Sequence, residues 1–142
     1  MTSSWQFWAL GAAGFAAMTA VLAKVGVQGV NSDLATMIRT AVVLVMAAGI
    51  VAVSGQFEGL GMIAPRTWLF LGLSGLATGA SWLCYFRALQ LGPVSAVAPV
   101  DKLSVVLVAV FGALFLGERL PPLAWLGIVM ILVGILIVLW ST

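Results

Sequence analysis

Long apolar stretches separated by short polar segments dominate the chain. Each stretch holds about 20 residues, which is the length a helix needs to cross the hydrocarbon core of a bilayer. Charged and turn-forming residues separate the stretches, and the pattern predicts five membrane-spanning helices at residues 5–26, 34–54, 67–90, 94–116 and 121–140. We therefore expect an all-α integral membrane protein, with about five helices in a compact bundle and residues 1–142 forming one domain.

The connection between the third and fourth predicted helices is very short. Only Leu91, Gly92 and Pro93 are available to reverse the chain there, so two shorter helices remain an alternative. Pro93 and Pro121 suit the first turn of a helix, where a missing N–H leaves no hydrogen bond unmade. Both prolines therefore suit the start of the helix that follows them.

Composition agrees with the membrane interpretation and excludes several function classes. Of the residues, 63% are hydrophobic and 7% are charged, whereas about a quarter of a soluble domain is charged. The absence of His from the sequence excludes histidine zinc sites and Ser-His-Asp triads. A net charge of +2 gives no nucleic-acid footprint. We expect no enzymatic activity, no cofactor and no bound metal.

The positive charges are nearly balanced between the two sides of the membrane. If the helices alternate in direction, Arg66 and Arg119 lie on one side, and Lys24 and Arg87 lie on the other. Because the distribution of Lys and Arg normally fixes orientation, this balance is as expected for a chain that can insert both ways. A fixed topology set by a weak bias is the alternative.

A few ionisable residues fall inside the predicted helices. An ionisable group inside a membrane span costs roughly 2.5 to 3.5 kcal/mol on insertion scales and is a functional candidate by default. Asp101 is the deepest carboxylate, about 10 Å along the helix from Pro93. The candidates of this kind are Lys24, Arg39, Arg87, Asp101 and Lys102.

The segment around Asp101 combines charge with backbone disruption. Asp101 and Lys102 point about 100° apart on a helix, so we expect one of them to need a partner on another helix. Arg39 or Lys24 could neutralise Asp101 in a static pair; an ion-coupling or substrate-charge site is the alternative. Pro99 removes a backbone hydrogen bond and predicts a kink, and Ser104 adds a hydroxyl.

Aromatic residues form a second candidate group near the end of the third predicted helix. Trp82, Tyr85 and Phe86 could line a wall of a binding site, with Tyr85 offering a hydroxyl. Packing in the aromatic belt at the membrane interface is the alternative. For Glu118 and Arg119, at the end of the fourth helix, we favour a simple interfacial position.

The order and spacing of several short segments resemble the EamA family of the drug/metabolite transporter superfamily. The resemblance covers essentially the whole chain. It rests on Ala23-Lys24-Val25-Gly26, Ile38-Arg39-Thr40, Ala88-Leu89-Gln90-Leu91-Gly92-Pro93, Leu114-Phe115-Leu116-Gly117-Glu118-Arg119, and a last helix with Gly127 and Gly134.

The resemblance implies a five-helix unit, two of which in inverted orientation make the larger members of the family. It therefore suggests a homodimer, whose antiparallel form would match the inverted repeats, or pairing with a second chain. Family members typically export small organic molecules through a central cavity. For this chain we expect a prokaryotic plasma membrane. Carried over residue by residue, the family's binding positions are matched to Lys24, Arg39, Trp82, Tyr85 and Asp101.

The four-helix multidrug exporters, which are closest in size, resemble the chain less well. Their membrane-embedded Glu in the first helix has no counterpart between Trp5 and Ala23. We therefore expect a secondary transporter that moves a small organic solute by alternating access. A membrane interaction subunit, whose polar pairs only hold helices together, is the competing hypothesis.

Overall fold

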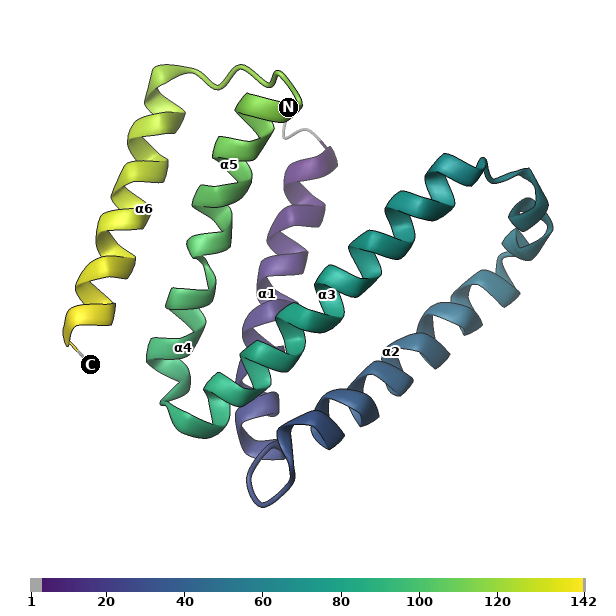
Figure 1. The fold of residues 1–142 in the computed structure, drawn as a ribbon, viewed down its shortest axis with the longest axis horizontal. Helices are drawn as coiled ribbons and strands as arrows, with labels where there is room; N and C mark the ends of the chain where they lie inside the picture. Colours follow the sequence, from purple (N-terminus) through teal and green to yellow (C-terminus); the bar gives the residue numbers. More distant parts are fainter. Residues whose placement is uncertain (1–3, 142) are drawn as a thin grey trace. The chain divides into compact units, whose positions relative to one another are not determined.

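The computed structural model describes residues 4–141, and within this range it contains helices and no strand (Figure 1). The helices are α1 (Ser4–Gly26), α2 (Ser32–Val53), the short 3₁₀ helix η1 (Gln56–Met62), α3 (Pro65–Leu91), α4 (Val94–Asp101), α5 (Leu103–Phe115) and α6 (Pro122–Ser141). Together they provide five segments long and apolar enough to cross a membrane, α4 and α5 forming one of them. The predicted all-α membrane architecture is confirmed.

The ends of the helices follow from local chemistry. α2 begins at Ser32, two residues before the predicted start, because the Asn31 side-chain oxygen caps it by accepting from the amide of Asp33 at 2.8 Å. Asp33 lies in the first turn, where the helix dipole favours a negative charge. α3 begins at Pro65, at the position where a proline costs no hydrogen bond.

Pro93 and Pro121 each lie directly before a helix, so the predicted start of the fourth span at residue 94 is confirmed and the last helix starts one residue later than predicted. Pro93 has an extended backbone with ψ of 141° and precedes α4, its carbonyl accepting from the amides of Ala96 and Val97. The Pro121 carbonyl accepts from Ala124 in the same way, and α6 starts at Pro122. Each proline carbonyl thus begins the hydrogen-bond ladder of the following helix from outside it.

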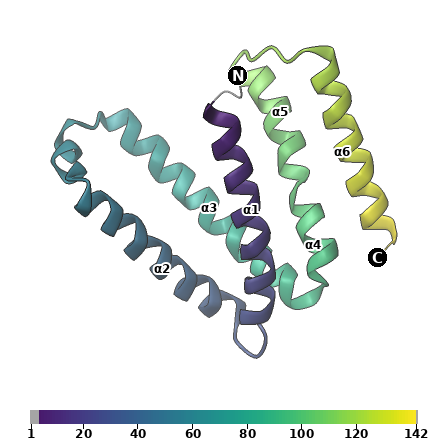
Figure 2. The same cartoon turned by 180° about the vertical axis from the view of Figure 1, so that it is seen from behind.

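The chain divides into two units, which we describe separately. The first comprises the described residues 4–21 and 91–141. In it α6 packs along α4 and α5, as Figures 1 and 2 both show. The buried residues of these helices are Ala96 on α4, Gly112 on α5 and Ile135 on α6, and two of the three are small. Small side chains let helix backbones approach closely where lipid gives no hydrophobic drive.

The second unit, residues 22–90, contains the end of α1, all of α2 and η1, and almost all of α3. Its buried side chains gather where α1 ends, α2 begins and α3 ends. Leu89 and Val27 are the most fully enclosed, at 0% and 2% exposure, and Phe86 lies at 3%. Buried Ser32 and Thr36 belong to the same region, so this end of the unit is its packed core.

Most other large apolar side chains are exposed, along the full length of every long helix. Such a surface would drive a water-soluble chain to associate, whereas hydrocarbon solvates it. The exposure is therefore what an integral membrane protein requires, with lipid as the direct partner of these faces.

Candidate functional site

Arg39 lies inside α2 on a face that turns toward α3. It is seven residues beyond Ser32, which places it about 10 Å along the helix. The side chain is half-buried. A permanent positive charge at this depth is expensive in a membrane span, so its surroundings decide what it can do.

The surroundings of Arg39 are aromatic. Its guanidinium carbon lies 4.0 Å from the centroid of the Trp82 ring and 5.5 Å from that of Phe86. Trp82 and Phe86 are four residues apart on α3, a spacing that places both rings on one face of a helix. Both distances are within the range in which a cation is attracted to the face of an aromatic ring.

Tyr85 extends this cluster. Its ring meets Phe86 edge to face, with centroids 6.5 Å apart and planes inclined by 69°. Edge-to-face contact is a favoured geometry for aromatic pairs. The structure thus brings three residues expected from the sequence, Arg39, Trp82 and Tyr85, into one group with Phe86; we call these four residues the arginine–aromatic cluster.

Lys24 lies in the same unit but contacts a different group. Its ammonium donates to the carbonyl oxygen of Leu89 in the last turn of α3, where a positive charge complements the helix dipole. Gln90 makes a second tie of this kind, its amide donating to the Val30 carbonyl at 2.6 Å. Together they fix the end of α3 against the α1–α2 connection, beside the arginine–aromatic cluster.

Hydroxyl groups in α2 are satisfied within the helix. Thr36 donates to the Ser32 carbonyl at 2.8 Å and Thr40 to the Thr36 carbonyl at 2.7 Å. Back-bonding of this kind removes the need for a partner on another helix. These residues support the helix that carries Arg39.

The first unit holds the other candidate group, at the break between α4 and α5. Lys102 has ψ of −2°, far from the helical value near −42°, and its amide donates to the Pro99 carbonyl three residues earlier. The Ser104 hydroxyl donates to the Asp101 carbonyl at 2.9 Å. The structure therefore interrupts the fourth span three residues after Pro99.

The expectation that one of the adjacent residues Asp101 and Lys102 needs a partner on another helix is wrong. Lys102 Nζ lies 3.1 Å from Asp101 Oδ2, and the two side chains neutralise each other. The 100° separation assumed a continuous helix, whereas Lys102 lies at the interruption and its long side chain can fold back toward the carboxylate. The side chains are 35% exposed for Asp101 and 52% for Lys102.

Glu118 has a role that the sequence did not reveal. Its side chain folds back over Gly112, where an added Cβ would lie 2.8 Å from Glu118 Oε2. Its amide also donates to the Gly112 carbonyl at 3.1 Å, and Gly117, with φ of +68°, makes the turn possible. The only indication of this turn in the sequence is the Gly117-Glu118 pair directly after an apolar helix.

The chain is similar to proteins of a transporter family. The model of the EamA-like transporter family matches residues 3–140. A Sinorhizobium sp protein named "Uncharacterized transporter in cobO 3'region" is 62% identical over 137 residues, which cover 96% of this chain and 97% of that protein.

Two other relatives are matched over a smaller part. "Uncharacterized transporter YwfM" of Bacillus subtilis (strain 168) is 31% identical over 80 residues, 54% of this chain and 26% of that protein. "Probable 4-amino-4-deoxy-L-arabinose-phosphoundecaprenol flippase subunit ArnE" of Yersinia pestis (strain Pestoides F) is 34% identical over 74 residues, 52% of this chain and 65% of that protein. No solved structure matches the chain.

Proposed function

The chain belongs to the EamA-like transporter family, and from this premise we propose that it is a secondary transporter that moves a small organic solute by alternating access. Membrane transport in general follows from the family and from relatives named as transporters. The mechanism, the dimer and the kind of solute are the proposal.

The interrupted fourth span is the observation that carries the proposal. Discontinuous helices at membrane depth are typical of secondary transporters, because the broken segment can move and can present charge to a solute or ion. Here the break holds the Asp101–Lys102 ion pair and the Ser104 hydroxyl. We assign to these three residues the binding of the coupling ion or of a charged group of the solute.

The second group of binding residues lies within residues 22–90 of the same chain. Arg39, Trp82 and Tyr85 form most of the arginine–aromatic cluster, and Lys24 is tied to the end of α3 beside it. Aromatic faces and a few polar atoms are the usual lining of a small-molecule site. We assign these four residues to contacts with the solute.

The assembly we propose is an antiparallel homodimer of this five-helix chain. The match to the Sinorhizobium protein supports it, because 97% of that relative is matched by this five-helix chain. The balanced positive charges support insertion in both orientations. The bacterial relatives point to a prokaryotic plasma membrane, with export as the proposed direction.

Reconstitution of the purified chain alone tests the proposal. Proteoliposomes are loaded with a bacterial metabolite extract, and mass spectrometry compares what leaves wild-type vesicles, Asp101→Asn vesicles and protein-free vesicles. We expect at least one solute to leave only from the wild-type vesicles, and the protein to be a dimer in mild detergent. Release indistinguishable from that of protein-free vesicles, or transport by a strictly monomeric species, contradicts the proposal.

A second candidate is a membrane subunit that has no transport activity of its own. The similarity to a relative named as a flippase subunit favours it. In that case the Asp101–Lys102 pair and the Arg39–Trp82 contact only hold helices together. Flux that appears only when a second membrane protein is co-reconstituted would support this alternative.

A further inference from the structure

Arg39 is a membrane-embedded cation held by aromatic rings. Within residues 22–90 no carboxylate lies within ion-pair distance of it. The acidic residues of this unit are placed elsewhere: Asp33 in the first turn of α2 beside its Asn31 cap, and Glu58 on η1. Its own unit thus stabilises the charge of Arg39 without neutralising it.

Within residues 22–90 the contacts described for the Arg39 guanidinium are with aromatic rings, and none is an ion pair. A guanidinium group over a ring uses its flat face, whereas its five N–H donors point outward in the plane. The guanidinium carbon lies 4.0 Å from the Trp82 centroid, a distance at which the ring attracts the cation. The N–H donors that do not face a ring can bind a planar or tetrahedral oxyanion through two parallel hydrogen bonds.

Arg39 and Trp82 lie at similar distances from the helix ends on one side of the unit. Arg39 is about 10 Å from the start of α2, and Trp82 is about 14 Å from the end of α3. These two helix ends lie on the same side of the unit, where Gln90 is tied to Val30. An anion bound here lies inside the hydrocarbon depth, where a charge-assisted hydrogen bond is stronger than in water.

Lys24 increases the preference for a negative ligand. Its ammonium is fixed on the Leu89 carbonyl, one turn of α3 beyond Phe86. Two cations of one unit therefore lie beside the same stretch of α3. Their combined field favours an anion and disfavours a cation at this place.

We propose that Arg39, with Trp82, Phe86 and Tyr85 around it, binds the carboxylate or phosphate group of the transported solute. The inference rests on the proposed function and names its substrate class: a small organic oxyanion or an amphiphile with an oxyanionic headgroup. Trp82 and Phe86 hold the guanidinium in place, and the Tyr85 ring packs against Phe86.

Binding to the purified, folded protein in nanodiscs tests the inference independently of transport. The free probes are hexyl phosphate, hexanoate and hexyltrimethylammonium, which share one tail. A second arm uses nanodiscs of phosphatidylcholine with and without phosphatidic acid, so that a headgroup source is separated from a soluble one. Tryptophan fluorescence reports binding, and Trp82→Phe shows how much of the signal comes from this ring.

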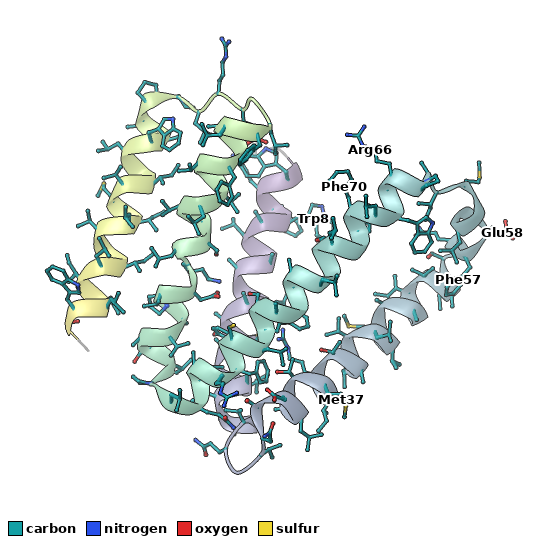
Figure 3. The ribbon with its side chains drawn as sticks, viewed as in Figure 1. Trp8, Met37, Phe57, Glu58, Arg66 and Phe70 are labelled. Atoms are coloured by element: carbon teal, nitrogen blue, oxygen red, sulfur yellow. The ribbon has the colours of Figure 1, made fainter. Side chains whose placement is uncertain are left out.

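We expect an oxyanion in at least one arm to bind the wild type and the ammonium probe not to bind. Arg39→Gln should weaken oxyanion binding roughly 10- to 100-fold, the effect of losing hydrogen bonds to a charged donor. Arg39→Lys should weaken it less, and Trp82→Leu should weaken it with the charge still present. Arg66→Gln is the matched control, since Arg66 also lies over a ring, that of Phe70, at 5.7 Å (Figure 3).

Equal responses of the wild type to all three free probes and to both nanodisc compositions would overturn the inference. Unchanged oxyanion binding by folded Arg39→Lys and Trp82→Leu variants would overturn it as well. Transport of a neutral solute at the wild-type rate by Arg39→Gln would contradict the oxyanion substrate class and support the transport function. Arg39-dependent binding of an oxyanion without any flux would support the oxyanion site and contradict the transport function.

Discussion

The guanidinium carbon of Arg39 on α2 lies 4.0 Å from the centroid of the Trp82 ring on α3. This contact joins two long helices at membrane depth through a charge that lipid alone would not tolerate. It has a measurable consequence for stability, separate from any role in binding.

A double-mutant cycle between Arg39 and Trp82 should give a coupling free energy of about 1 to 2 kcal/mol, because a partly desolvated cation–π pair contributes in this range. The variants Arg39→Gln, Trp82→Leu and the double variant are unfolded reversibly in mixed micelles, and the free energies of unfolding are compared. The matched cycle uses Arg66 and Phe70, which are 5.7 Å apart at the exposed start of α3. Its coupling should be at most about 0.5 to 1 kcal/mol. Equal coupling in the two cycles would show that the Arg39 contact has no special strength.

Asp101→Asn should change stability little and transport strongly. The Asp101–Lys102 pair is partly exposed and local, and the freed Lys102 ammonium can extend to a polar region. We expect the free energy of unfolding to fall by less than about 1 kcal/mol. Flux from proteoliposomes should be lost. A drop of about 3 kcal/mol or more, the range for breaking a buried pair, would identify the pair as structural.

Pro99→Ala should join α4 and α5 into a continuous helix. Removal of the proline restores a backbone donor. The free energy of unfolding should therefore not fall, and it could rise by up to about 3 kcal/mol. If the interruption must move during transport, the rate should fall although the protein is more stable. Pro122→Ala, at the first turn of α6, is the control. An unchanged rate for Pro99→Ala would separate the break from the mechanism.

Glu58→Lys should fix the orientation of the chain in the membrane. Glu58 is exposed on η1, in the connection that leads to Arg66 at the start of α3 (Figure 3). The substitution moves the near-balanced distribution of positive charge to one side. Labelling of a terminal tag should report two orientations for the wild type and one for the variant. A single wild-type orientation would contradict dual insertion.

The sequence predicted the spans well because hydrophobic length and proline positions decide them. It also singled out Arg39, Trp82 and Tyr85, since an ionisable residue and aromatics inside apolar helices are conspicuous. Their mutual contact depends on how α2 and α3 meet, which no local pattern encodes. The Asp101–Lys102 pair was missed for a local reason: helical geometry was applied to Lys102, whose backbone leaves the helix.

Glu118 shows the same limit. Its place after an apolar helix predicts an interfacial position, whereas its approach to Gly112 requires the left-handed turn at Gly117. A sequence pattern indicates that a helix ends there. It does not give the path of the next residues.

The accessibility of position 104 to water tests the central claim most directly. In a Cys84→Ser background, Ser104→Cys places a thiol about 15 Å into the fourth span, and Met130→Cys places a control thiol on the exposed face of α6. If Ser104 lines a solute pathway, a membrane-impermeant thiol reagent should label Ser104→Cys in sealed vesicles and leave Met130→Cys unlabelled. Labelling of Ser104→Cys only by a lipid-soluble reagent, at the rate of the Met130→Cys control, would mean that this break is a dry helix contact and that the transport account is wrong.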